Sequence, residues 1–473
     1  MAVLVRPHNS TSARRRIETL LARCEQENGR LLPRPVVLEG DLSQFDLNLD
    51  AASVKWISQH CQSVIHNAAS LTFCAGSSNG EPMQTNVEGT RRILELCRFT
   101  GIRQFHHVST AYVCGLRQGR VLESELNVGQ MLGNDYEKSK VEAEKMVRGA
   151  DFLDPPTFYR PSIIVGDSQT NYTSTFHSFY AILKLAHTLV SKVFLGSTSA
   201  SALLAMLDLN GNERKNFVPV DWVSAAISEI FGCPDRHGKT YHLTSKEPTR
   251  LADMAEAVQE AVETYSQPAD PNDGPVCDGS WFERTFREQM KIYGSYWRDD
   301  PDFDTENTEA AVPHLPCPRV DCNMMLRLAK FAIESGFRPP RFQQTEREFD
   351  VRHHLQGLFQ PCGEMPETPG GQIFLGLQVD GPGGGAWEVA VNNGKPVAAE
   401  EGLSSRCTAT FHLDSRTCRQ LISRQVTVEQ AHKQSQVQIE GNGIDLKQLL
   451  TILQATVTEP PAGTPRVSSR SGA

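Results

Sequence analysis

The chain has 473 residues and a formal net charge of −9 at pH 7. This length suffices for two or three domains. The acidic balance gives no electrostatic reason to expect binding to nucleic acid or to an anionic membrane. The 12 cysteines are scattered, with no Cys-x-x-Cys pair and no Cys/His cluster at zinc spacing, so the sequence predicts neither disulfides nor a metal site.

The termini and apolar runs indicate where the protein works. The first six residues lack the longer apolar core of a signal peptide, and the last three are no peroxisomal address. No run approaches the ~20 apolar residues that a membrane span needs. We therefore expect a soluble, cytoplasmic protein with no integral membrane segment.

Residues 2–166 alternate short apolar runs with helical patterns, which is typical of a parallel sheet built from βαβ units. The predicted strands are Ala2–Val5, Val36–Leu38, Val64–Ile65, Phe105–Val108 and Thr157–Val165. Three successive strands end in small or polar residues, at the sheet edge where open α/β folds bind ligands. The pattern predicts an α/β fold with a doubly wound, Rossmann-type parallel sheet.

The candidate catalytic residues are Thr110, Tyr136 and Lys140. Thr110 closes a strand pattern, and Tyr136 opens a charged helical pattern 26 positions later. Tyr136 and Lys140 are four residues apart, so on a helix they share a face. We expect the Lys140 ammonium to lower the pKa of Tyr136. Tyr136 would then serve as general acid for a carbonyl oxygen, with the Thr110 hydroxyl as a second donor.

A second Tyr-x-x-x-Lys pattern, Tyr180 to Lys184, serves as an internal control. Its spacer is wholly apolar, and no hydroxyl-ended strand precedes it at a comparable distance. This pattern predicts a helix that faces the core.

The segment Val108 to Val113, followed by Tyr136-x-x-x-Lys140, resembles the extended short-chain dehydrogenase/reductases. It is most similar to thioester reductases and fatty acyl-CoA reductases of the male sterility type. That resemblance implies a Ser/Thr–Tyr–Lys catalytic set and a nicotinamide cofactor. It assigns the hydroxyl role to Thr110 rather than Ser109, and has Lys140 hold the cofactor ribose.

The cofactor predicted is NADP. Arg6 closes the first strand, where a fold that prefers NAD carries an acidic residue, and a guanidinium suits a 2′-phosphate. The resemblance adds Arg16 on the following helix, the adenine-flanking pair Asp41 and Leu42, and Asn86, which would brace the active-site strand. The remaining expected contacts are the small residues Asn67, Ala68 and Ala69, and the backbone around Pro161, Ser162 and Ile163.

The turn that holds the pyrophosphate in such folds, Gly-x-x-Gly-x-x-Gly, is not found before Arg6. The strand at Ala2–Val5 therefore corresponds to the family's second strand. We expect a chain that is shorter at its N-terminus than the working enzyme. A gap should separate the strands at Ala2–Val5 and Val64–Ile65, where the family's first strand lies.

The pattern changes after a Pro/Gly-rich stretch near residue 365, from alternating helices and strands to several short strands in succession. Leu375, Leu377 and Val379 share one face. The order of elements resembles the sterol carrier protein fold, which encloses an apolar tunnel, and the alternative is a structural or dimerising module.

The predicted domains follow from these changes. They are a Rossmann-type reductase domain that is incomplete at its N-terminus (1–248), a helical and irregular substrate-binding extension (249–358), a linker (359–371), a sterol carrier-like lipid-binding domain (372–458) and a disordered tail (459–473). Within the extension, the aromatic-rich stretch Tyr293 to Asn307 would suit a wall of an acyl pocket.

Together these features predict an NADPH-dependent reductase of an acyl thioester, carried on CoA or an acyl-carrier protein, that yields an aldehyde or alcohol. The C-terminal domain would hold a lipid or sterol. Two alternatives stay open: a non-catalytic lipid-binding protein with a degenerate reductase scaffold, and a nucleotide-sugar epimerase or dehydratase. A homodimer also stays open.

Overall fold

The computed structural model describes residues 1–8, 11–73, 80–190, 199–266, 279–291, 294, 296–339, 349–355, 373–441 and 446–458. Contacts divide the chain into two compact units. Unit 1 combines Met1–Gln62 and Phe99–Gly101 with Phe342–Ala473, and unit 2 comprises Ser63–Arg98 and Ile102–Arg341. This division does not follow chain order, because the first 62 residues group with the C-terminal part.

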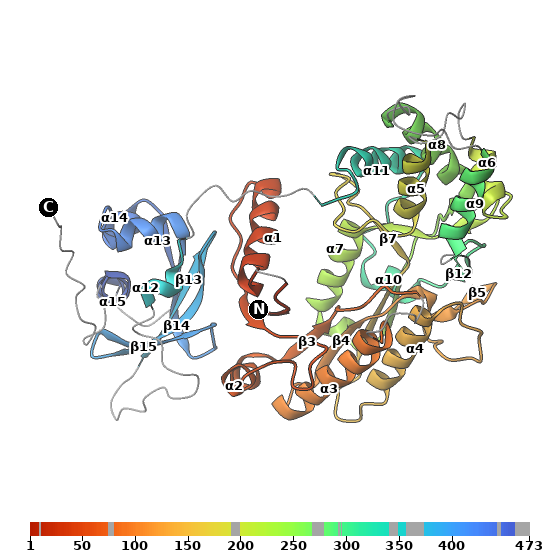
Figure 1. The fold of residues 1–473 in the computed structure, drawn as a ribbon. Coiled ribbons are helices and arrows are strands. Elements are labelled where there is room, and N and C mark those ends of the chain that lie inside the picture. The colour runs from red at the N-terminus through yellow and green to blue at the C-terminus, as the bar shows by residue number, and fades with distance from the viewer. Residues whose placement is uncertain are drawn as a thin grey trace. The chain divides into compact units, whose positions relative to one another are not determined.

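Unit 2 is built on a parallel four-stranded sheet of order β10-β6-β4-β3 (Figure 1). Its strands are β3 (Ser63–His66), β4 (Gln104–Val108), β6 (Thr157–Pro161) and β10 (Thr240–Leu243). Helices α3 (Gly89–Thr100), α4 (Asp135–Arg148) and α7 (Val220–Phe231) alternate with these strands along the chain. Strands β6 and β10 are buried along their whole length, as expected for a parallel sheet. The predicted parallel α/β fold is confirmed.

The N-terminal strands are not part of that sheet. Strand β1 (Ala2–Val5) pairs in parallel with β2 (Val36–Glu39) in a sheet of two strands, accompanied by α1 (Ala13–Asn28) and α2 (Ala51–His60). The expectation of one doubly wound sheet is therefore wrong for the described strands. A doubly wound sheet of order 3-2-1-4-5-6 has one more strand between the strands that correspond to β1 and β3. Among the described residues, no strand pairs with both β1 and β3.

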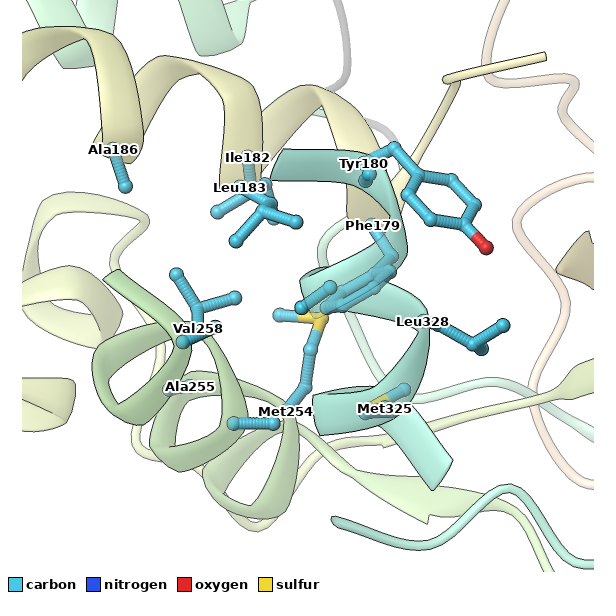
Figure 2. Packing of buried hydrophobic residues seen from close by; sticks show 14 of the residues in the cluster. Phe179, Tyr180, Ile182, Leu183, Ala186, Met254, Ala255, Val258, Met325 and Leu328 are labelled. Atoms are coloured by element: carbon cyan, nitrogen blue, oxygen red, sulfur yellow. The ribbon is translucent and has the colours of Figure 1, made fainter. Parts of the chain in front are cut away.

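The remaining elements of unit 2 lie beyond the four-stranded sheet. Helices α5 (Phe179–Val190), α8 (Leu251–Tyr265) and α11 (Cys322–Glu334) share one apolar core (Figure 2). The other elements are η1 (Gln84–Glu88), η2 (Ala111–Cys114), β5 (Arg120–Val121), β7 (Ile163–Val165), α6 (Ala200–Met206), β8 (Arg214–Lys215), β9 (Phe217–Pro219), η3 (Pro234–Arg236), β11 (Thr249–Arg250), α9 (Gly279–Met290), β12 (Asp302–Phe303) and α10 (Glu306–Ala311). Short two-stranded pairings join β5 to β12, β7 to β9 and β8 to β11.

Tyr180 lies in this core, as predicted for the second Tyr-x-x-x-Lys pattern. Its side chain is 2% exposed, whereas Lys184 lies on the exposed side of α5. The Tyr180 hydroxyl points away from the apolar cluster (Figure 2) and accepts a hydrogen bond from the Gly166 amide at 3.0 Å. The core-facing prediction is confirmed.

The C-terminal part of unit 1 is an α+β module. Its sheet has the order β15-β14-β13-β16-β17, with β13 and β16 parallel and the other neighbours antiparallel. The strands are β13 (Ile373–Asp380), β14 (Gly385–Asn392), β15 (Lys395–Glu401), β16 (Cys407–Asp414) and β17 (Val437–Gly441), and the helices are α12 (Val351–Leu355), α13 (Ser415–Ile422), α14 (Val428–Lys433) and α15 (Leu446–Thr458). The predicted linker and tail lie outside the described residues.

The alternation predicted for this module is confirmed in β13. Leu375, Leu377 and Val379 are all buried, and they pack in one apolar core with Trp387 and Phe411. Burial of alternate residues is what a sheet with one face on a core requires.

The described residues contain neither a membrane-spanning helix nor a cluster of metal-binding side chains. None of their helices combines the length and apolar character needed to cross a membrane. None of their His, Cys, Asp and Glu side chains gather in a group of three or more that could hold a metal ion.

Candidate active site

Thr110 and Tyr136 meet at the carboxyl end of β4. Thr110 follows that strand and starts η2, and Tyr136 lies in the first turn of α4. The Asn134 side chain caps α4 by accepting from the Glu137 amide at 2.9 Å, which fixes where the helix begins. The Thr110 side chain lies near enough to the Tyr136 phenol to lower the pKa of Tyr136. The structure thus brings together two groups that are 26 residues apart.

Lys140 is buried on the same helix, with 3% exposure, and its ammonium donates to the Val108 carbonyl at 2.7 Å. Burial lowers the pKa of Lys140 to about 8, and the Glu144 carboxylate opposes this shift. Burial also raises the pKa of Tyr136 to about 12, against a smaller lowering by the Thr110 side chain. The expectation that Lys140 lowers the pKa of Tyr136 is therefore wrong. The ammonium is directed at the β4 backbone, and desolvation of the phenol outweighs nearby dipoles.

Asn86 joins the loop after β3 to the helix of Tyr136. Its side chain accepts from the Ser70 amide at 2.7 Å and donates to the Ser70 carbonyl and to Ser139 Oγ. Ser139 Oγ in turn donates to the Tyr136 carbonyl at 2.7 Å. Asn86 was expected to brace the active-site strand, but its side chain braces a loop and a helix instead, because π-helix η1 places it beside both.

The small residues Asn67, Ala68 and Ala69 belong to the loop that Asn86 holds. All three are exposed directly after β3. A loop without bulky side chains leaves its backbone accessible to a ligand at this sheet edge.

The segment Pro161 to Ile163 joins β6 to β7 beside Thr110. The Pro161 carbonyl accepts from Thr110 Oγ1 at 3.4 Å. Ser162 Oγ donates to Asn216 Oδ1 at 2.8 Å, and the Ile163 amide donates to the Asn216 carbonyl. The Ser162 hydroxyl therefore positions this segment through Asn216.

The remaining predicted cofactor residues lie in unit 1. Arg6 is exposed just beyond β1, and the Arg16 guanidinium on α1 donates to the Arg6 carbonyl, so two arginines gather at this strand end. Asp41 Oδ1 accepts from the Ser43 amide at 2.9 Å, and Leu42 is half-buried beside it. The predicted cofactor set is thus divided between the two units.

Sequence reasoning missed several residues next to Tyr136. Phe73 contacts the Tyr136 ring, Tyr296 contacts Phe73, and a buried ion pair between Lys215 and Asp300 lies behind them. The aromatic-rich stretch that begins at Tyr293 was the available signal for Tyr296 and Asp300, although Tyr293 itself lies outside the described residues. Lys215 gave no signal, because a single lysine before a strand is usually exposed.

A polar cleft of about 400 Å³ opens in unit 2 next to Asp300 and Phe303. Its rim carries Arg120, Arg214 and Lys246, each paired with a carboxylate. None of the predicted catalytic or cofactor residues lines the cleft, whereas residues 300–306, from the stretch predicted as a wall of an acyl pocket, do.

Comparison with known proteins gives the family context. The family model described as "Male sterility protein" matches residues 1–227. The aldehyde reductase lnaA of Aspergillus flavus is 24% identical over 69% of this chain, and the fatty acyl-CoA reductase wat of Drosophila melanogaster is 23% identical over 44% of it. Over these stretches the chain is therefore similar to proteins named as reductases. The chain spans 33% and 46% of the length of these two proteins.

Solved structures agree on the fold. The terminal R domain of the myxalamid PKS-NRPS pathway has a TM-score of 0.55 at 25% identity, over 72% of this chain and 86% of that domain. A thiolation-reductase di-domain of an archaeal non-ribosomal peptide synthetase has a TM-score of 0.51 at 17% identity, over 71% of this chain and 70% of the other.

Proposed function

We propose that this protein is an NADPH-dependent reductase of an acyl thioester, which it converts to an aldehyde or alcohol. The observation that carries the proposal is the placement of Thr110 and Tyr136 together at the carboxyl end of β4, with Lys140 one helical turn further along α4. Catalysis of carbonyl reduction needs a proton donor held at the carbonyl oxygen, and this pair supplies two hydroxyls at one place.

The protonation states suit this role. With its pKa near 12, Tyr136 carries its proton at neutral pH and can pass it from the phenol oxygen to the substrate carbonyl oxygen. Thr110 offers a second donor to the same oxygen. A bound nicotinamide would supply the hydride. Lys140 is mostly cationic below its pKa of about 8, so it stabilises negative charge that develops at the site.

Residues of unit 2 could hold the nicotinamide end of the cofactor. The loop Asn67 to Ala69 leaves an exposed backbone at the sheet edge, and Lys140 lies one helical turn after Tyr136 on α4. The choice of NADP over NAD rests on unit 1 by itself, where Arg6 and Arg16 gather two guanidinium groups that suit a 2′-phosphate.

The substrate class rests on what similar proteins are named for. The matched relatives include the non-reducing polyketide synthase pkiA of Emericella nidulans, 24% identical over 48% of this chain, and the fatty acyl-CoA reductase of Drosophila. A carrier-protein or CoA thioester is consistent with both names. We further propose that the α+β module of residues 373–458 holds a lipid, because its apolar core lies between a sheet face and helices α13, α14 and α15, together with α12 that precedes the range.

The test compares two tyrosines of the same motif. Tyr136→Phe removes the proton donor and keeps the ring, so turnover of an acyl-CoA should fall by ~10²-fold or more. Tyr180→Phe removes the acceptor for the Gly166 amide and should cost ~1–3 kcal/mol in stability with turnover intact. Equal loss of turnover in both variants would contradict the assignment of Tyr136.

One observation favours a second candidate, a non-catalytic lipid-binding protein. The predicted cofactor residues are divided between two units, and β1 and β2 do not join the four-stranded sheet on which helix α4 with Tyr136 follows β4. Titration with NADPH separates the candidates, since a reductase enhances the fluorescence of the bound dihydronicotinamide. A flat titration together with binding of a fluorescent fatty acid would favour the second candidate.

A further inference from the structure

A row of three aromatic side chains from separate parts of the sequence begins at Tyr136. The Phe73 ring meets the Tyr136 ring edge-on at a centroid distance of 5.8 Å, and Tyr296 lies 5.1 Å from Phe73. Tyr112 lies 5.1 Å from Tyr296 on the other side. Phe73 and Tyr136 keep partial exposure, whereas Tyr296 and Tyr112 are buried. The cluster thus has an accessible front at the reactive phenol and a buried back.

A buried ion pair supports the back of this cluster. The side chains of Lys215 and Asp300 are 1% and 3% exposed and form a salt bridge. Asp300 Oδ2 accepts from the Tyr112 hydroxyl and from the Asn216 amide, each at 2.8 Å. The Lys215 ammonium lies 5.3 Å from the Tyr112 ring centroid and 5.8 Å from that of Tyr296. The Lys215 ammonium therefore lies near both rings, and the Asp300 carboxylate holds the Tyr112 ring through its hydroxyl.

The stability of the folded state does not by itself explain why Lys215 and Asp300 are buried as an ion pair. Burying two charges costs desolvation energy, and apolar residues of similar size often serve the folded state as well or better. Directional contacts are what apolar residues do not supply. A carboxylate bonded to a phenol and an ammonium over two rings fix where the rings lie.

Tyr296 is also linked to the start of the catalytic helix. The Asn134 side chain, which caps α4 two residues before Tyr136, lies near enough to the Tyr296 phenol to lower its pKa, although burial raises that pKa overall. The same ring therefore contacts Phe73 on the accessible side and lies near the start of the helix that carries the proton donor.

We propose that Phe73 is a specificity-determining residue whose ring contacts the acyl carbons next to the reacting carbonyl, and that Tyr296, Lys215 and Asp300 are positioning residues that support it from behind. An aromatic surface favours planar, conjugated groups over flexible saturated ones. The acyl group selected is therefore an α,β-unsaturated or aryl thioester. This inference rests on the proposed reductase function.

The experiment uses the full chain with NADPH and two thioesters of equal length, trans-2-octenoyl-CoA and octanoyl-CoA. The ratio of kcat/KM values for the two should exceed one in the unaltered protein. Phe73→Leu should lower this ratio about 2- to 10-fold, as expected for one aromatic contact. Tyr296→Leu should lower it as well, because the Phe73 ring loses its support. The change should fall on the thioester KM, with the KM for NADPH unchanged.

Lys215→Met should lower the same ratio, because the charge that orients Tyr296 is lost. Lys330→Met is the matched control, since its ammonium lies 5.6 Å from the Tyr265 ring between α11 and α8, away from the site. If Lys215→Met does not fold, Tyr296→Phe takes its place. That variant keeps the ring and should keep the ratio.

The outcomes separate this inference from the function on which it rests. An unchanged ratio in Phe73→Leu, with both thioesters turned over, would overturn the role of Phe73 and leave the reductase function intact. Failure of the unaltered protein to reduce either thioester while NADPH binds would overturn the proposed function itself.

Discussion

At the Tyr136 site, burial shifts the pKa values of two neighbouring groups in opposite directions. It raises the pKa of the phenol to about 12 and lowers that of the Lys140 ammonium to about 8. Both shifts favour the neutral form, as desolvation requires. At neutral pH the phenol therefore retains its proton, and Lys140 titrates just above the physiological range.

The Lys140 shift predicts a pH profile. Because Lys140 loses its charge above about pH 8, kcat/KM should fall on the alkaline side of that value. Lys140→Arg keeps a positive charge at every accessible pH, so its alkaline limb should disappear even if its maximum is lower. Steady-state rates from pH 6 to 10 provide the measurement. An identical alkaline limb in both proteins would show that another group controls it.

The same shift has a consequence for stability. The folded protein releases the Lys140 proton near its lowered pKa of about 8, and the unfolded chain releases it near the ordinary lysine pKa of 10.5. Between these values the unfolded chain binds more protons, so the free energy of unfolding should rise with pH. Lys140→Met should lack this rise, which denaturant unfolding at pH 7 and pH 9.5 can detect.

The position of Arg6 at the end of β1 predicts that NADPH is preferred to NADH. Arg6→Asp replaces a partner of the 2′-phosphate by a like charge, so the ratio of kcat/KM with NADPH to that with NADH should fall at least ~10-fold, the value of one charge-assisted hydrogen bond. Arg15→Asp makes the same charge change on an exposed neighbour in α1 and should leave the ratio near that of the unaltered protein. A ratio that falls equally in both variants would reflect net charge rather than a site at Arg6.

At the scale of elements, α4 is tied to the sheet by a fully buried ion pair. Arg160 on β6 donates to both carboxylate oxygens of Glu144, at 3.2 and 2.6 Å, and both side chains are 0% exposed. Arg148 adds two more bonds to the same carboxylate. Although burial opposes ionisation, these cations leave the pKa of Glu144 below its ordinary value. The carboxylate is therefore ionised at neutral pH and anchors the helix of Tyr136.

Glu144→Gln should accordingly destabilise unit 2 by about 3–5 kcal/mol, because it leaves Arg160 as a buried charge without its counter-ion. Glu142→Gln on the same helix breaks only an exposed pair with Lys145 and should cost under about 1 kcal/mol. Urea unfolding at pH 7 gives both values. Comparable losses would mean that the buried pair adds nothing beyond a surface one.

At the scale of the whole molecule, the N-terminal helices belong with the C-terminal module. Trp56 on α2 donates from its indole nitrogen to the Glu401 carbonyl, and Arg14 on α1 lies 3.8 Å from Asp350 and 3.7 Å from Glu401. Residues 1–62 and the module should therefore unfold together, and unit 2 should unfold as a separate cooperative transition.

Trp56→Ala tests this grouping. Trp56 is 8% exposed and stacks on His60 at 4.6 Å, so its loss should cost several kcal/mol and lower one calorimetric transition by roughly 5 °C or more. The transition of unit 2 should stay in place. Phe45→Ala, at an 87% exposed aromatic residue of unit 1, should move neither. A shift of both transitions by Trp56→Ala would contradict the division.

The sequence by itself determined the features that depend on local pattern. Strands β1, β2, β4 and β6, the core-facing helix of Tyr180 and the alternation in β13 all follow from the spacing of apolar residues, which is written in a few consecutive positions. The pairing of Thr110 with Tyr136 was also predictable, because the carboxyl ends of parallel strands and the helices that follow them meet at one edge.

Only the tertiary structure decided the features that depend on distant partners. The direction of the Lys140 ammonium is set by the Val108 carbonyl, and the pKa of Tyr136 by desolvation, neither of which sequence spacing reveals. Lys215 is buried only because Asp300, 85 residues away, offers it a counter-ion. Likewise, β1 and β2 form their own sheet because strand pairing depends on which strands come together in space. Such contacts are absent from any local window of the sequence.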